Sequence, residues 1–134
     1  MPLVRIDTIE GRPDADLSAI GAAVHRALVE CFAVPERDQF QVITQHRRGA
    51  LIYNRDYLGI ERTDGIVLVQ IFLSTGRSEE QKKAFYARTA HLISEQAHTR
   101  PEDVVISLVE NTRGDWSFGN GVAQYLTLPK EEWR

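Results

Sequence analysis

Residues 66–81 read IVLVQIFLSTGRSEEQ, an apolar run followed directly by a turn and the start of a helix. The apolar run, rich in β-branched residues, favours a strand from Ile66 to Ser74. Ser78 with Gln81 three residues later is typical of a capping box at a helix amino terminus. The apolar residues that follow at helical spacing are Phe85, Leu92 and Ile93.

The same arrangement occurs 65 residues earlier in the chain. Residues 3–8 alternate as a strand, Gly11-Arg12 breaks it as Gly76-Arg77 does later, and a helix pattern follows. The apolar residues of this first helix are Leu17, Ile20, Val24, Ala27, Leu28 and Cys31. Proline turns at 35–38 and 100–103 then lead into strands at 40–44 and 104–109. The sequence therefore predicts two β-α-β units in tandem.

These units place the chain in the α/β (α+β) class, as a single domain over residues 1–134. The internal repeats cover about 2–48 and 66–113, with a linker at 49–65 that has room for a short hairpin and a tail at 114–134. Parallel strands need a crossover of this length, so we expect a four-stranded mixed sheet with two helices on one face. The bare face should be buried against other subunits, which predicts a homo-oligomer.

Composition excludes several functional classes. The net charge is -3 with both signs interspersed, which gives no basic surface for nucleic acid. No apolar run reaches the ~18–20 residues of a membrane span, and the first residues do not resemble a signal peptide. The single cysteine, Cys31, fits a reducing cytoplasm. Since the four histidines lack metal-ligand spacing, we expect no metal site. Taken together, these features predict a cytoplasmic protein with no membrane or nucleic-acid partner.

The chain begins Met1-Pro2, directly before the first strand. Removal of the initiator methionine, which is usual before a small residue, would leave Pro2 as a rigid secondary amine. An α-amino group titrates near ~7.7–8.0, so it can serve as an acid or a base near neutrality. Most such starts carry no chemistry, and Pro2 becomes a catalytic candidate only together with the repeats behind it.

Three polar residues are candidates for the same site. Arg77 precedes a helix amino terminus, where a cation is unfavourable unless it binds an anion such as a substrate carboxylate or turns into solvent. Arg12 holds the equivalent place in the first repeat. Asp38 opens a strand after a proline turn, a common structural role, and gains interest only if its strand lies beside that of Pro2.

The stretch DWSFGNG at residues 115–121 concentrates two aromatic side chains, Trp116 and Phe118, among small residues. Such a loop either covers core, forms an oligomer contact or walls a pocket that excludes water. No helix pattern follows its glycines, so we do not expect it to bind phosphate.

Together these features resemble the malonate semialdehyde decarboxylase family of the tautomerase superfamily. The resemblance runs nearly end to end. Its most specific stretches are residues 2–12, 35–38, 77–82, 109–111 and 115–119.

This resemblance implies a homotrimer without cofactors, with Pro2 as the catalytic amine, Asp38 as its carboxylate partner and Arg77 as the residue that binds the substrate carboxylate. Trp116 and Phe118, with Tyr125, would form an apolar wall. The best-known decarboxylases of the family carry a second arginine two positions before Arg77. Here that substrate-binding position is Thr75, and Arg12 is the candidate for compensating.

The first function hypothesis is a lyase that converts malonate semialdehyde to acetaldehyde and carbon dioxide, with hydratase side activity on 2-oxo acids. The alternative is a keto–enol tautomerase of a 2-oxo acid such as phenylpyruvate. A third is a non-catalytic trimeric binding protein, which retention of Met1 would favour. A pKa of Pro2 well above neutrality favours the lyase, and one below neutrality the tautomerase.

Overall fold

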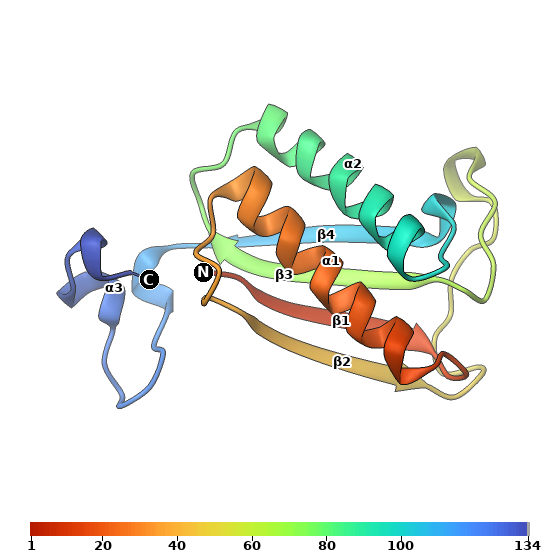
Figure 1. Cartoon of the computed structure of the whole chain (residues 1–134), viewed down its shortest axis with the longest axis horizontal. Helices are drawn as coiled ribbons and strands as arrows, with labels where there is room; N and C mark the ends of the chain where they lie inside the picture. The colour runs from red at the N-terminus through yellow and green to blue at the C-terminus, as the bar shows by residue number, and fades with distance from the viewer. Residues whose placement is uncertain (134) are drawn as a thin grey trace.

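The computed structural model describes residues 1–133 and has at its centre one sheet with two long helices (Figure 1). Each lies where the sequence predicts it, with ends that differ from the predicted ones by at most a few residues. In chain order these are β1 (Leu3–Ile9), α1 (Asp14–Phe32), β2 (Phe40–His46), β3 (Val67–Ser74), α2 (Glu79–Gln96) and β4 (Val104–Asn111).

The sheet is mixed, with strand order β2-β1-β3-β4. Within each repeat the strands are parallel, whereas β1 and β3 pair antiparallel at the centre. The register sets Leu3 beside both Phe40 and Phe72. β1 and β2 therefore begin at the edge where β3 and β4 end. We call this end of the sheet, where Leu3 and Phe40 lie, the cavity edge. The opposite end, where β1 and β2 finish and β3 and β4 begin, is called the sealed edge.

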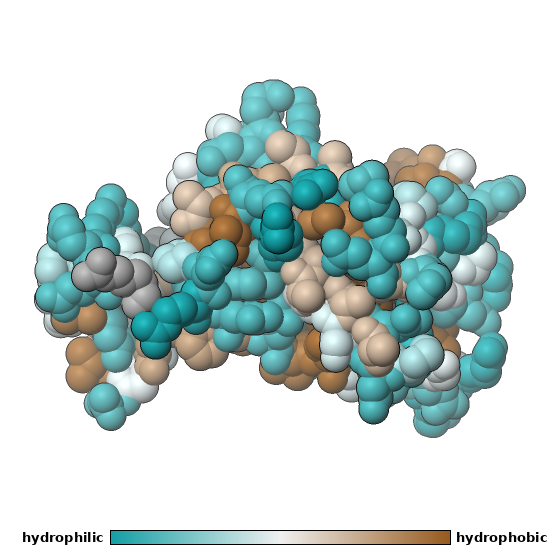
Figure 2. Space-filling model, viewed as in Figure 1, coloured by the Kyte–Doolittle hydropathy of each residue, from teal (hydrophilic) through white to brown (hydrophobic). Residues whose placement is uncertain are grey.

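Both long helices cover the same face of the sheet, as predicted (Figure 1). The core between them combines inward strand residues such as Val4 and Ile71 with helix residues such as Leu28 and Phe85, all at most 1% exposed. Seen from this side, the surface is mostly hydrophilic, with small hydrophobic patches (Figure 2).

The other face of the sheet has no helix over it. Its outward residues include several large apolar side chains that are 37–49% exposed: Leu3, Phe40, Val42, Val105 and Val109. No described helix combines the length and apolarity needed to cross a membrane.

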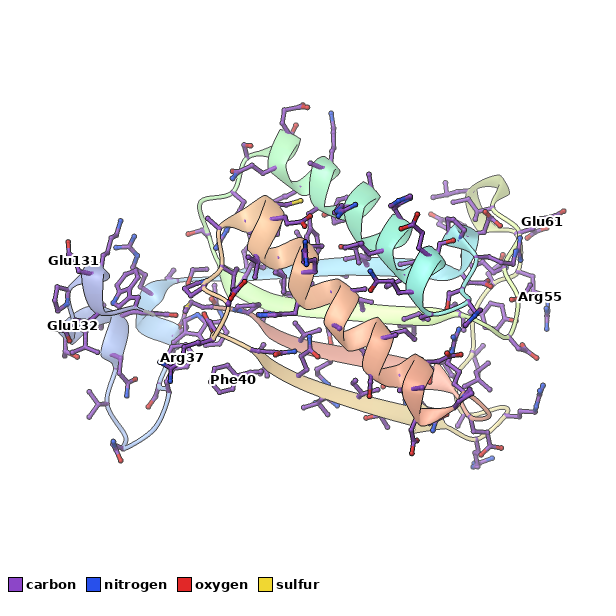
Figure 3. All side chains as sticks on the ribbon, in the orientation of Figure 1. Arg37, Phe40, Arg55, Glu61, Glu131 and Glu132 are labelled. Carbon is purple, nitrogen blue, oxygen red and sulfur yellow. The ribbon has the colours of Figure 1, made fainter. Side chains whose placement is uncertain are left out.

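The linker and the tail lie at opposite ends of the sheet. The linker forms no hairpin: its regular structure is one 3-10 turn, Tyr57–Gly59, and Asp64 ties it together by accepting hydrogen bonds from Tyr53 and Arg48. The tail extends beyond the cavity edge through three short helical turns, Arg113–Asp115, α3 (Gln124–Thr127) and Lys130–Glu132. Figure 3 shows Arg37 and Phe40 at the tail's end of the molecule, and Arg55 and Glu61 at the linker's end.

Candidate active site

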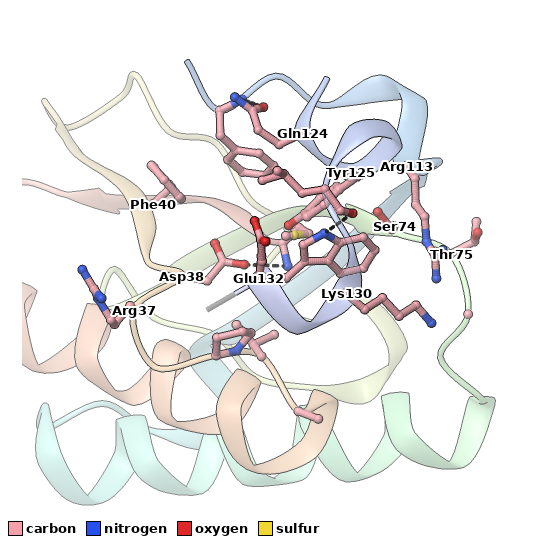
Figure 4. A pocket seen from close by; sticks show the side chains of 18 of the residues that line it. Arg37, Asp38, Phe40, Ser74, Thr75, Arg113, Gln124, Tyr125, Lys130 and Glu132 are labelled. Atoms are coloured by element: carbon pink, nitrogen blue, oxygen red, sulfur yellow. Dashed lines mark hydrogen bonds and ion pairs between the residues drawn. The ribbon is translucent and has the colours of Figure 1, made fainter. Parts of the chain in front are cut away.

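A cavity of about 750 Å³ lies between the cavity edge and the tail (Figure 4). The turns before β2 and after β3 form its floor, and the tail forms its outer wall. In Figure 4, Arg37 and Asp38 lie on one side of it and Thr75 and Arg113 on the other. Six charged side chains line it, four of them cationic: Arg37, Asp38, Arg77, Arg113, Lys130 and Glu132.

Asp38 lies on the cavity floor beside the chain's amino terminus. A turn fixes it, because its backbone N–H donates to the carbonyl oxygen of Pro35 at 3.0 Å. Its Oδ2 lies 3.0 Å from the α-amino nitrogen of Met1, and the two side chains are only 12% and 13% exposed. The parallel pairing of β1 with β2 brings the groups together, as the prediction for Asp38 required.

Pro2 itself lies behind Met1, buried and outside the cavity lining. With Met1 in place the nitrogen of Pro2 is an amide and has no basicity. Covalent geometry sets it within about 4 Å of the Met1 nitrogen. Loss of Met1 would thus leave the Pro2 amine at the floor of this cavity, close to Asp38.

Charges around the amino terminus act in opposite directions. Burial lowers the pKa of the Met1 amine below its ordinary value; Asp38 raises it by hydrogen bonding and charge, and Arg77 lowers it. Arg77 acts on the Met1 amine through its charge and not through a hydrogen bond. The floor therefore holds an amine between one anion and one cation.

Arg77 folds back over the end of β3 instead of turning into solvent. Gly76, with a φ of 125°, makes the turn before it, and the predicted capping box of Ser78 and Gln81 fixes the helix start behind it. Its Nη1 donates to the carbonyl oxygen of Ser74 at 2.9 Å. Its guanidinium carbon lies 5.4 Å from the ring centroid of Phe32. Held in this way, Arg77 forms part of the cavity lining.

Thr75 also lines the cavity, at the predicted position. Its backbone N–H donates to the carbonyl oxygen of Asn111 at 2.9 Å, which ties the turn after β3 to the end of β4. Next to it, the hydroxyl oxygen of Ser74 is buried with no hydrogen-bond partner in the described chain. A buried hydroxyl without a partner is unfavourable.

Aromatic side chains form the outer wall, although not all those predicted. Phe118 and Tyr125 line the cavity with ring centroids 5.0 Å apart, and the ring of Trp133 contacts that of Tyr125 in a tilted arrangement at a centroid distance of 4.6 Å. Trp116 does not line it: this indole stacks on the far side of Phe118 and donates to Asn111 Oδ1. Burial raises the pKa of Tyr125, Asp38 adds to this and Arg77 opposes it, so the phenol stays protonated.

Arg12 lies at the sealed edge, and its predicted role in the site is wrong. Because β1 and β3 run antiparallel, the turn after β1 is at the end of the sheet opposite to the turn after β3. There the Arg12 guanidinium donates to the carbonyl oxygen of Gly65 and, at 3.0 Å, to Thr99 Oγ1. Asp103, the counterpart of Asp38, is buried and accepts from Thr63. Arg12 thus holds the sealed edge together.

Sequence reasoning missed the contribution of the tail. Arg113, Gln124 and Trp133 all line the cavity. A signal was available for Arg113, because parallel β3 and β4 end at the same edge and the residues after them must meet. Among residues 1–133, no group of three metal-ligating side chains lies together.

Comparison with known proteins gives a consistent family. Two sequence models, both described as tautomerase enzyme, match residues 38–119 and 2–59. The probable tautomerase YusQ of Bacillus subtilis (strain 168) is 40% identical over 94% of this chain and 99% of its own length. The probable tautomerase YrdN of the same strain is 38% identical over 95% and 98%.

Solved structures agree with this relationship. A malonate semialdehyde decarboxylase, described with decarboxylase and hydratase activities, is 38% identical, with a TM-score of 0.88 over 93% of this chain and 96% of that one. A second such decarboxylase, inhibited by 3-bromopropiolate, is also 38% identical, with a TM-score of 0.89 over 93% and 95%. A fused 4-OT described as a symmetric trimer shares the fold at a TM-score of 0.76 and 21% identity, over 93% and 98%.

Proposed function

Because the chain belongs to the tautomerase superfamily, we propose that, once Met1 is removed, the Pro2 amine acts with Asp38 and Arg77 on small oxo acids. The reaction we propose first is the decarboxylation of a 3-oxo acid, with malonate semialdehyde as the type substrate. The observation that carries this proposal is the 3.0 Å pair of the Met1 amine and Asp38, because loss of Met1 would leave the Pro2 amine close to the same carboxylate, in a cavity that Arg77 also lines.

In this mechanism Arg77 binds the substrate carboxylate and the protonated Pro2 amine donates a hydrogen bond to the aldehyde oxygen. The bond between the α-carbon and the carboxylate carbon breaks, and its electron pair moves into the carbonyl group to give an enolate. Carbon dioxide leaves, and a proton added to the α-carbon gives acetaldehyde. The ammonium and nearby dipoles stabilise the enolate oxygen, as in an oxyanion hole. A Schiff base between Pro2 and the aldehyde would accept the same electron pair.

Asp38 has two roles in this proposal. Its negative charge and hydrogen bond favour the protonated amine against the effects of burial and Arg77. The same carboxylate is placed to activate a water molecule, which would support a hydratase side activity on 2-oxo acids. The two malonate semialdehyde decarboxylases at 38% identity support this assignment over nearly the whole chain.

The second candidate is keto–enol tautomerisation of a 2-oxo acid such as phenylpyruvate, in which a neutral Pro2 abstracts a proton. Two observations favour it. Burial lowers the pKa of the Met1 amine, and the same burial would increase the neutral fraction of a Pro2 amine at this place. Both curated relatives are described as probable tautomerases.

We also propose that the protein is a homotrimer. The uncovered sheet face supports this, because Phe40 and Val42 leave 49% and 42% of their area exposed beside other large apolar residues. Several large apolar side chains exposed together on one face mark an interaction surface. The fused 4-OT of the same fold is described as a trimer.

Mass spectrometry followed by two assays tests the function. After the amino terminus is established, the protein is incubated with malonate semialdehyde and, separately, with phenylpyruvate enol. If acetaldehyde is released from malonate semialdehyde faster than phenylpyruvate enol is converted to its keto form, the lyase is supported. The reverse order of rates supports the tautomerase. Turnover of neither substrate by protein with a free Pro2 amine would contradict both and leave a non-catalytic binding protein.

A further inference from the structure

The cavity holds more positive charge than one carboxylate requires. The whole chain has a net charge of -3, yet cationic side chains outnumber carboxylates four to two in the cavity lining. A concave site with such an excess attracts anions. Arg77 can bind one carboxylate, and the other cations then have no role in the proposed reaction.

The cavity is also larger than the type substrate. The cavity has a volume of about 750 Å³. If each of the six heavy atoms of malonate semialdehyde takes about the 30 Å³ that one water molecule takes in the liquid, the substrate fills roughly a quarter of the cavity. A longer substrate therefore has room to extend from Arg77 toward the tail.

Arg113 is the cation best placed to meet the far end of such a substrate. It begins the turn directly after β4, where the Thr112 backbone N–H and hydroxyl each donate to Asp115 Oδ2 at 2.8 Å. The hydrogen bond from Thr75 to Asn111 holds this turn against the one that carries Arg77. Arg113 lies across the cavity from Asp38 in Figure 4.

Its guanidinium is oriented, and it has no charged or hydrogen-bonded partner among residues 1–133. The guanidinium carbon lies over the ring of Trp133, 5.2 Å from its centroid, and this cation–π contact restrains the side chain. Within residues 1–133 it makes no hydrogen bond or ion pair. A planar, restrained guanidinium with free N–H donors is suited to bidentate binding of a carboxylate, whereas Lys130 is a flexible point charge.

We propose that Arg113 determines substrate specificity by binding a second carboxylate, so that the site prefers small oxo diacids to oxo monoacids. Malonate semialdehyde is then a minimal substrate that reaches only Arg77. This inference rests on the proposed function, because Arg77 must hold the carboxylate at the reacting end.

Two five-carbon acids test it, since 2-oxoglutarate ends in a carboxylate where 2-oxopentanoate ends in a methyl group. Calorimetric titration of the full chain with a free Pro2 amine should give about 10-fold tighter binding of 2-oxoglutarate. Arg113→Ala should abolish this preference by weakening the binding of 2-oxoglutarate, and Arg113→Lys should restore part of it. Arg47→Ala, which removes an exposed cation after β2 near the sealed edge, is the matched control and should alter neither affinity.

Equal binding of both acids by the wild type, or a preference that survives in Arg113→Ala, overturns the role of Arg113. The proposed function survives that result provided that Arg77→Ala weakens the binding of both acids. If the wild type binds neither acid, this inference fails, while the turnover assays with malonate semialdehyde and phenylpyruvate enol still decide the proposed function. If Arg77→Ala changes neither affinity, Arg77 does not bind the carboxylate, and both the proposed role of Arg77 and this inference fail.

Discussion

Replacing Arg12 and Arg77 separately by alanine should give opposite results, although the two residues hold equivalent places in the repeats. Arg12 donates to the carbonyl oxygen of Gly65 and to Thr99 Oγ1 at 3.0 Å, while its contact with the carbonyl oxygen of Ala97 is at the 3.5 Å limit. A hydrogen bond to a charged group contributes about 1.5–3 kcal/mol. Because the side chain is only partly buried, we take the lower value for the two good bonds.

Arg12→Ala should therefore lower the free energy of unfolding by about 3 kcal/mol, which corresponds to a fall in Tm of about 10 °C for a domain of this size. Turnover by the folded protein should stay near normal, because the sealed edge lies at the other end of the sheet. Urea unfolding and kcat/KM, measured at one protomer concentration, check both values.

Arg77→Ala should reverse the pattern. It removes one bond, to the carbonyl oxygen of Ser74, but also an unfavourable cation at a helix amino terminus, so stability should change by less than about 1 kcal/mol. Loss of a partly desolvated ion pair with the substrate should cost roughly 2–5 kcal/mol, or about 30- to 5,000-fold in kcat/KM. A destabilised but fully active Arg77→Ala protein would refute the reasoning, as would an Arg12→Ala protein that is stable but inactive.

Three further changes test the remaining parts of the site. Pro2→Ala, or retention of Met1, should abolish most activity with the fold intact, as circular dichroism and turnover can establish; wild-type rates would exclude Pro2. Asp38→Asn removes the group that raises the amine pKa, so the fall in decarboxylation with rising pH should move to lower pH; a pH–rate profile that does not move contradicts this role. Phe40→Asp with Val42→Asp should convert a species of three times 15.2 kDa to monomer in sedimentation equilibrium, whereas a wild-type monomer contradicts the trimer.

The 65-residue repeat allowed both β-α-β units, and hence the strands and the helix-covered face, to be predicted from sequence. The same repeat misled the prediction for Arg12, because periodicity says nothing about whether the units pair in the same or in opposite directions. The prediction that Trp116 lines the cavity was wrong, because its indole N–H donates a hydrogen bond to Asn111 Oδ1 and the ring lies outside the cavity lining. The sequence did not predict Trp133 as part of the cavity wall, because its position depends on a tilted ring contact with Tyr125, which has no periodic pattern in sequence.

Because the two repeats pair antiparallel, each chain has two similar sheet edges, the cavity edge and the sealed edge, but among residues 1–133 the cavity of the candidate site lies at only one of them. At the sealed edge Thr63 donates to Asp103 through its backbone N–H and its hydroxyl, at 2.7 and 2.6 Å, and a side chain on Gly65 would meet Asp103 at 3.2 Å. The chain's own linker thus takes the place that a ligand would have in a symmetric molecule. We therefore expect a binding stoichiometry of one ligand per chain, and we expect that removing the contacts of Thr63 with Asp103 would open the sealed edge at the expense of stability.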